Sequence, residues 1–338
     1  MNILRKIFVN LHSVMTDIHS IRHSLAPELN KLNDLIAERL RSSNPLINDV
    51  ISRYLSQKGK QLRPMMVILT ARILGACDPD RVITSGASIE MLHNASLIHD
   101  DVIDQSSTRH GMPTINAMWD NHIAVLVGDY FVSTALQLVI TTGDLRAVNT
   151  IASLGRLLST GEMDQINIAT NHSISEEAYF EIITHKTASL FIACVEMGAY
   201  ASDATQEQLD IMRRFACLFG QCFQIKDDIF DYFHSESLGK PTGNDLREGK
   251  VTLPLIHALK ATDHPRCAEM NALVSRDGLS DEEIATLIDY AIEAGGIEYA
   301  DATLMRLRNE AAAVLSSLGD VDTTPLLSLL DYIIARDM

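Results

Sequence analysis

The sequence predicts an all-α protein folded as one large helical domain, and three observations support that prediction. Turn-forming residues are sparse, with 17 Gly and 9 Pro in 338 residues. Apolar residues recur at helical spacing, as at Leu29, Leu32 and Ile36, whereas the alternation typical of a half-buried strand is hard to find. No Ser/Gly-rich or Pro-rich linker divides the chain, so we expect a single domain over 1–338.

Periodicity and breaks place the helices in order along the chain. The run that contains Leu29 and Ile36 ends at Ser42-Ser43-Asn44-Pro45. We expect further helices over 46–57, 64–74, 80–104, 115–119, 121–141, 144–170, 175–201, 205–235, 251–261, 280–294, 296–317 and 323–336. Clusters of Gly, Pro, Ser, Asn and Asp separate them at 59, 75–80, 106–113, 142–144, 171–175, 237–249 and 262–265.

One predicted helix also resembles a membrane span. Residues 123–140 are apolar and nearly long enough to cross a bilayer. Asp129 lies within them, at a cost of about 2.5–3.5 kcal/mol near a membrane centre, and Gln137 adds to that cost. We therefore expect a fully buried helix of the bundle, and leave contact with a membrane surface open.

Charge and cysteine content limit the classes of function. Asp plus Glu number 44 against 28 Lys plus Arg, a net charge of −16, which argues against a nucleic-acid partner. The five cysteines form no CxxC pair and indicate reduced thiols in a cytoplasmic protein. Arg5 and Lys6 interrupt the apolar residues at the start of the chain, so we expect no signal peptide.

An acidic pattern, DDxxD, occurs twice within apolar helical sequence. Its members are Asp100, Asp101, Asp104, Asp227, Asp228 and Asp231. On a helix the first and last Asp of each copy lie only about 40° apart, and like charges at this spacing destabilise the helix unless a cation neutralises them. Oxygen ligands suit Mg²⁺, which proteins hold with a few carboxylates and substrate phosphates. A solvated acidic surface is the alternative, but two copies favour a diphosphate bound through Mg²⁺ between two helices.

Cationic residues near the first motif are candidates for binding a second diphosphate. Lys60 and Arg63 lie in a short basic turn before an apolar helix, and an Arg grips phosphate with a bidentate fork. His93 lies two turns before Asp100 on the same helical face. Arg109 and His110 follow that motif. Taken singly, a solvated loop or a structural histidine remains the alternative.

A second group of candidates surrounds the second motif. Lys186 and Thr187 lie within an apolar helix, where a lysine needs a partner. Gln224 precedes Asp227 by three residues on the same face. The glycine-containing loop 238–250 carries Lys240 and Lys250 and is suited to closing over a phosphate, with a plain flexible loop as the alternative.

Together these motifs resemble those of the trans-prenyltransferases, the head-to-tail polyprenyl diphosphate synthases. EMLHNASLIHDDVID is similar to the first Asp-rich motif of that family, GQCFQIKDDIFDY to the second, and GKPTGNDLREGKVTLPLI to the segment that follows. The match runs from Lys60 to Pro254. It implies an all-α bundle around a central cavity, usually a homodimer, with helices of 1–42 packing on it or making dimer contacts.

The resemblance also implies an activity and a set of roles. The reaction would join isopentenyl diphosphate head-to-tail to an allylic diphosphate, such as farnesyl diphosphate, by ionisation, condensation and elimination. Two or three Mg²⁺ ions would bind the six aspartates, with Asp100, Asp101, Asp104, Lys186 and Asp227 as the catalytic residues. Isopentenyl diphosphate would bind Lys60, Arg63 and His93, and the allylic diphosphate Arg109, Lys186, Thr187, Gln224, Lys240 and Lys250.

Two positions depart from the family pattern. His110 stands where the family commonly has the second of two arginines; it is expected at the isopentenyl diphosphate, to which a histidine still donates a hydrogen bond. The usual GGKRLRP reads KGKQLRP here.

Product length is predicted from the residues four and five positions before the first motif. These are Ser96 and Ala95, both small, which leave a product tunnel open. We expect a product of about C35–C50, centred on octaprenyl diphosphate, with peripheral membrane contact for its release; each turn of helix advances about 5.4 Å along such a tunnel. Residues that could cap the tunnel further along are Met91, Ser133, Gln137 and Leu138.

Three alternatives remain open. The first is a short-chain synthase that makes geranylgeranyl or farnesyl diphosphate. The second is a class I terpene cyclase, which would usually lack the second DDxxD and the turn with Lys60 and Arg63. The third is a non-catalytic synthase subunit, which should have lost its Asp motifs.

Overall fold

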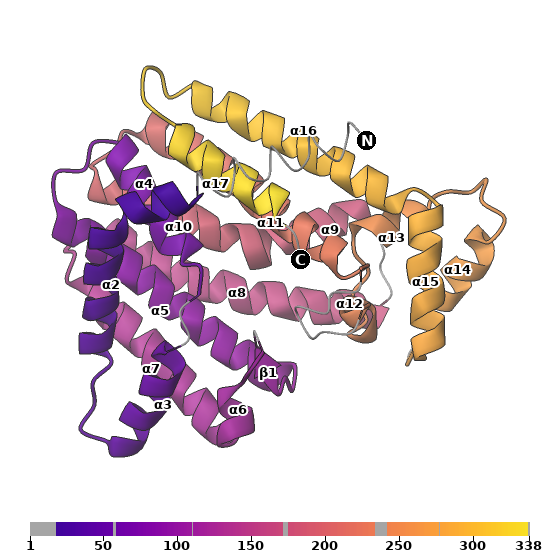
Figure 1. Cartoon of the computed structure of the whole chain (residues 1–338), viewed down its shortest axis with the longest axis horizontal. Coiled ribbons are helices and arrows are strands. Elements are labelled where there is room, and N and C mark those ends of the chain that lie inside the picture. The colour runs from indigo at the N-terminus through magenta and orange to yellow at the C-terminus, as the bar shows by residue number, and fades with distance from the viewer. Residues whose placement is uncertain are drawn as a thin grey trace. The chain divides into compact units, whose positions relative to one another are not determined.

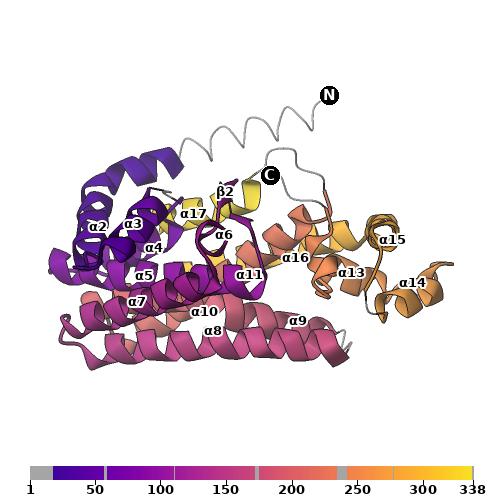
Figure 2. The same cartoon turned by 90° about the horizontal axis from the view of Figure 1, so that it is seen from below.

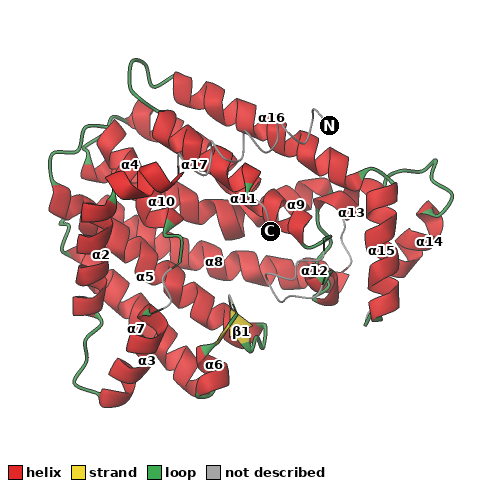
Figure 3. Ribbon diagram, viewed as in Figure 1, coloured by secondary structure: helices red, strands yellow, loops and turns green. Residues whose placement is uncertain are grey.

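A computed structural model describes residues 18–56, 59–109, 111–171, 175–233, 242–276 and 278–336, with the side chains of 167–171 excepted. Helices dominate these ranges, as the all-α prediction requires (Figure 3). The described strands are Thr108–Arg109 (β1) and Met112–Pro113 (β2), which pair as a short antiparallel hairpin. The hairpin occupies the break expected at 106–113.

The helices follow one another along the chain with short connections. They are α2 (Ala26–Arg39), α3 (Pro45–Leu55), α4 (Leu62–Ile73), α5 (Pro79–Ile103), α6 (Ile115–Met118), α7 (Asn121–Ile140), α8 (Leu145–Asn171), α9 (Glu176–Ile183), the π-helix η1 (Thr184–Ala188), α10 (Ser189–Ala201), α11 (Gln206–Phe230), α12 (Asn244–Arg247), α13 (Leu253–Ala258), α14 (Cys267–Val274), α15 (Asp281–Glu293), α16 (Gly296–Ser316) and α17 (Thr324–Ala335).

Three predicted boundaries were wrong. The helix expected over 175–201 is divided by η1, and the helix expected over 205–235 ends at Phe230. Helix α14 was not predicted, because eight residues without a side-chain N-cap carry little helical signal of their own. It forms through tertiary packing, which buries Met270 and Val274.

The contacts divide the chain into two compact units. The first comprises 1–156, 190–216 and 314–329, and the second comprises 157–189, 217–313 and 330–338. The first Asp motif therefore belongs to the first unit and the second motif to the second. A single domain over the whole chain stays a prediction.

In the first unit, α5 packs along α7, and α2 and α4 pack on α5 (Figure 1). The approach of α7 depends on Gly128, where a Cβ atom would lie only 2.2 Å from Nε2 of His99 on α5. Helix α7 is also the one described helix that is long and apolar enough to cross a membrane. Its predicted complete burial was wrong: the face that meets α5 is buried, whereas Leu126 is 64% and Ile140 61% exposed.

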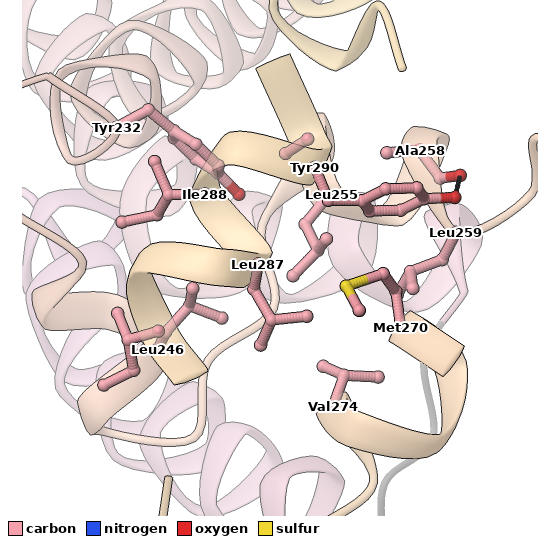
Figure 4. Close-up of a cluster of buried hydrophobic side chains, with 12 residues drawn as sticks. Tyr232, Leu246, Leu255, Ala258, Leu259, Met270, Val274, Leu287, Ile288 and Tyr290 are labelled. Carbon is pink, nitrogen blue, oxygen red and sulfur yellow. Dashed lines mark hydrogen bonds between the residues drawn. The ribbon is translucent and has the colours of Figure 1, made fainter. Parts of the chain in front are cut away.

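In the second unit, α13 and α14 pack against α15 around one apolar cluster (Figures 2 and 4). The hydroxyl of Tyr290 donates a hydrogen bond of 2.7 Å to the carbonyl of Ala258 at the edge of this cluster. Leu246 of α12 is one of its members, so the cluster fastens the segment that follows the second Asp motif. Gly243 precedes α12 with φ +76°, and a Cβ there would lie 2.5 Å from Cγ2 of Ile284.

Candidate active site

The second Asp motif lies at the end of α11, and its middle carboxylate is the most enclosed. Asp228 is 3% exposed and accepts hydrogen bonds from the Tyr179 hydroxyl at 2.6 Å and from Nε2 of Gln224 at 2.7 Å. Burial raises the pKa of Asp228 to about 7, against the effect of these two hydrogen bonds, and the charges of Asp227 and Asp231 raise it further. Its proton affinity therefore differs from that of an exposed aspartate.

The last carboxylate of the motif is bound by the segment that follows it. Asp231 accepts hydrogen bonds of 3.0 Å from the backbone N–H groups of Asn244 and Asp245. Asp245 is itself buried, and this burial, together with the charges of Asp228 and Asp231, raises its pKa well above the ordinary value. Sequence reasoning missed Asp245; the tight Gly-Asn-Asp turn just before it was the available signal.

The first carboxylate of the motif is the most accessible of those with a printed contact to a cation. The Asp227 side chain is 40% exposed and forms an ion pair with Arg336, which follows α17. Arg336 was not singled out from the sequence, because nothing local relates it to a residue more than a hundred positions earlier.

Lys186 and Thr187 are presented by the π-helix η1. Lys186 pairs with Glu162 of α8 and donates to Oε1 of Gln165 at 3.2 Å, so the partner that the sequence predicts for this lysine exists. Thr187 donates a hydrogen bond of 2.6 Å to Oε1 of Gln224. A π-turn within a helix frequently marks a functional site, because it displaces side chains from the regular helical positions.

These residues line one cavity of about 230 Å³ in the second unit. Four of the residues predicted to bind the allylic diphosphate contribute to its wall: Lys186, Thr187, Gln224 and Lys250. Asp228 and Asp245 line it as well, and so do Arg247 and Arg276, which sequence reasoning missed. Lys250 is ion-paired with Glu248. Lys240 lies outside the described residues.

In the first unit, the middle carboxylate of the first motif is paired with Arg109. Asp101 is 6% exposed, and Nε and Nη2 of Arg109 approach its Oδ1 at 2.9 and 2.8 Å. The β1–β2 hairpin presents this arginine. Asp100 is half-buried and Asp104 exposed. Arg109, predicted to hold a diphosphate, thus binds a motif aspartate here; His110 lies outside the described residues.

The predicted isopentenyl diphosphate residues surround the start of α4 and the middle of α5. Lys60 is exposed, and the guanidinium carbon of Arg63 lies 5.2 Å from the ring centroid of Phe191. Burial lowers the pKa of His93 well below its usual range, and the charges of Arg63 and Arg109 lower it further, so this imidazole is neutral near pH 7.

Two further residues shape this region. Gln61, at the departure from the family turn, has a left-handed φ of 55° and donates to Oδ1 of Asn33 at 2.7 Å. Glu90, which sequence reasoning missed, lies one turn before His93. Burial raises the pKa of Glu90 to about 7, although the charge of Arg63 lowers it.

The predicted chain-length residues lie on α5. Ala95 is 0% exposed, and the Ser96 hydroxyl donates to the carbonyl of His93 at 2.9 Å. Of the further capping candidates, Met91 and Leu138 are buried, whereas Ser133 and Gln137 are exposed on α7.

The donor chemistry fits a hard divalent cation. No group of three or more His, Cys, Asp or Glu side chains is preassembled around a metal position within the described ranges. Mg²⁺ does not require one, because it keeps several waters and binds through one or two carboxylates plus substrate phosphates. The accessible carboxylate Asp227 and the exposed Asp104 offer such oxygens.

Comparison with known proteins gives a consistent result. Residues 44–291 match the family model described as polyprenyl synthetase. The chain is 35% identical to a nonaprenyl diphosphate synthase of Mycobacterium tuberculosis, covering 90% of this chain and 91% of the relative. It is 32% identical to an octaprenyl diphosphate synthase of Escherichia coli, covering 95% and 99%.

Solved structures agree on the fold. A polyprenyl synthase from Caulobacter crescentus, complexed with calcium and isoprenyl diphosphate, superimposes with a TM-score of 0.87 at 29% identity, covering 95% of this chain and 98% of that one. A geranylgeranyl pyrophosphate synthase from Bacteroides thetaiotaomicron gives 0.81 at 36% identity, covering 95% and 100%.

Proposed function

The chain belongs to the polyprenyl synthetase family, and from that membership we propose that it condenses isopentenyl diphosphate head-to-tail with an allylic diphosphate to give a long all-trans polyprenyl diphosphate. The family makes it a prenyltransferase. The observation that carries the proposed chemistry is the cavity in which Lys186, Thr187, Gln224 and Asp228 meet.

The cavity suits departure of an allylic diphosphate. Lys186 supplies positive charge where the leaving group becomes more negative, and a charge fixed in advance lowers the barrier to ionisation. Glu162 and Gln165 hold that ammonium group in place. Apolar residues of the same wall, among them Ile182 and Val251, exclude water that would quench the allylic cation.

We assign the divalent cofactor to the Asp motifs. Two or three Mg²⁺ ions, held by the six motif aspartates, would neutralise the diphosphate oxygens and so assist their departure. The calcium in the structure of the Caulobacter crescentus protein supports a divalent metal in this family. The arrangement of Lys60, Arg63 and His93 in one unit supports their role at isopentenyl diphosphate.

The product is long in this proposal, about C35–C50 with octaprenyl diphosphate as the central expectation. The curated relatives that make nonaprenyl and octaprenyl diphosphate support this length, as does the small side chain of the buried Ala95. A short-chain product remains the second candidate, because a geranylgeranyl synthase is as similar as these relatives. We further propose a cytoplasmic homodimer that touches a membrane surface to release its apolar product.

Mass analysis of products tests the activity. With Mg²⁺, isopentenyl diphosphate and farnesyl diphosphate, the purified chain should form all-trans products of about C35–C50. Lys186→Gln should lower kcat by about 10²-fold or more, the usual effect of removing one group that stabilises developing charge. Lys260→Gln, an exposed lysine outside the cavity wall, is the matched control.

The alternatives predict other outcomes. Consumption of the allylic diphosphate without isopentenyl diphosphate would indicate a cyclase. An inactive purified chain would indicate a subunit that needs a partner.

Product length is tested at Ala95. Ala95→Phe places a ring on the buried face of α5 and should shift the main product to about C20 or shorter, because the growing chain meets the ring within the first turns of the helix. Leu126→Phe, at an exposed apolar site on α7, should leave the distribution unchanged. An unaltered distribution in Ala95→Phe would reject the tunnel at this position.

A further inference from the structure

The accessible carboxylate of the second Asp motif has a cationic partner from a distant part of the chain. Nη2 of Arg336 forms the ion pair with Asp227 and donates to the carbonyl of Phe223 at 3.4 Å. The guanidinium carbon lies 4.5 Å from the ring centroid of Phe223 and 5.4 Å from that of Phe230. With 13% exposure, the arginine side chain is seated in a formed site.

The position of the motif explains why a cation is needed there. Asp227 and Asp231 are one turn apart, and like charges at this spacing repel. They also lie at the C-terminal end of α11, where the helix dipole disfavours negative charge, and the last turn of that helix contains no basic residue. Asp231 is stabilised by backbone N–H groups, but the printed cationic contact of Asp227 is Arg336.

We propose that Arg336 is a positioning residue that neutralises Asp227 when no divalent cation is bound and competes with the cation for that carboxylate. The inference rests on the proposed role of Asp227 as a metal ligand. A guanidinium held against the carboxylate repels a second cation, so the ion pair weakens metal binding in the absence of substrate. The aromatic rings keep the arginine in place and set the strength of this competition.

The chain offers a matched control on the same helix. Nε and Nη2 of Arg308 on α16 contact the two carboxylate oxygens of Asp331 on α17, each at 2.8 Å. Arg308→Gln therefore weakens the attachment of the end of α17 without removing a contact to the second motif. Arg336→Lys keeps the positive charge and tests whether the charge or the guanidinium shape matters.

Binding of Mn²⁺ to the full chain, measured as free Mn²⁺ by electron paramagnetic resonance without diphosphate, tests the proposal. Arg336→Gln should bind Mn²⁺ roughly fivefold more tightly than wild type, the equivalent of about 1 kcal/mol for a partly exposed ion pair. Arg336→Lys and Arg308→Gln should stay near the wild-type affinity. In an Asp227→Asn background the effect of Arg336→Gln should vanish. Unchanged or weaker binding by a folded Arg336→Gln protein would overturn the competition.

Thermal unfolding gives a second readout. Competition requires Arg336→Gln to lower Tm more in EDTA than at saturating Mn²⁺, because a bound ion replaces the lost charge. Arg308→Gln should lower Tm equally in both. An equal loss for Arg336→Gln would make the arginine merely structural and overturn the proposal. Failure of the proposed metal role is a separate outcome: Asp227→Asn would then bind Mn²⁺ as wild type does.

Discussion

At the scale of the residue, Glu90 is an acid placed among cations that are predicted to bind a diphosphate. It lies on α5, one turn before His93, and burial raises its pKa from the ordinary 4.5 to about 7, with Arg63 acting in the opposite direction. A carboxyl that is largely protonated below pH 7 leaves the positive charge of Arg63 available to an anion. As Glu90 ionises, part of that charge is neutralised.

The raised pKa makes stability depend on pH with a defined sign. Because the folded protein binds this proton more tightly than the unfolded chain, the contribution of Glu90 to the free energy of unfolding falls as pH rises from about 4.5 to about 7. Glu90→Gln removes the titration. Its free energy of unfolding relative to wild type should therefore be higher at pH 8 than at pH 5, by up to about 3 kcal/mol.

Urea denaturation at the two pH values measures this difference. Glu269→Gln, at an exposed glutamate of α14, should show the same offset from wild type at both. A difference for Glu90→Gln that does not grow with pH would contradict the raised pKa.

Residues that belong to contiguous motifs could be predicted, and residues recruited through the fold could not. Lys186 was selected because a lysine in apolar sequence needs a partner, yet the identity of that partner, Glu162, required the structure. Asp245 and Arg336 carry no local pattern that separates them from ordinary surface charges. Their relation to the second motif arises only when the chain segments after α11 and α17 fold back onto it.

At the scale of the element, the π-helix η1 is the departure from regular structure that matters for the site. Sequence periodicity predicted one helix over 175–201, since a single π-turn shifts the apolar pattern by only one residue. The turn is braced by α11, where Gly220 approaches Ala188 so closely that a Cβ would lie 2.4 Å from its Cα. Close backbone packing of this kind cannot be predicted from a lone glycine in a helix.

This contact predicts a strong effect of one methyl group. Gly220→Ala should displace η1, and with it Lys186 and Thr187, lowering kcat about tenfold or more and stability by about 1–3 kcal/mol as an overpacked site. Gly155→Ala is the control, because a Cβ there meets nothing within 4 Å and alanine favours the helix by about 1 kcal/mol. Steady-state kinetics and thermal unfolding of both variants decide. Equal behaviour of the two would show that η1 is not braced by this glycine.

At the scale of the whole molecule, the net charge of −16 opposes the substrates that the protein is proposed to bind. A diphosphate must therefore be attracted by local cations, which are lysines and arginines of the two units and the divalent ions assigned to the aspartates. The helical fold and the motif order followed from the sequence, because periodicity and spacing are local properties. The division into two compact units did not, since no linker marks it.

The charge balance predicts that pyrophosphate stabilises the protein only together with Mg²⁺. At a hundredfold excess over Kd, a ligand of the folded state adds about 2.7 kcal/mol to the free energy of unfolding. We expect a rise in Tm of several degrees with Mg²⁺ and pyrophosphate, little change with pyrophosphate in EDTA, and a much smaller rise in Lys186→Gln, which lacks one cation of the cavity wall. Lys260→Gln should respond as wild type does. Scanning calorimetry at fixed ionic strength separates these arms, and stabilisation by pyrophosphate in EDTA as large as with Mg²⁺ would show that the protein's own cations hold the anion without the metal.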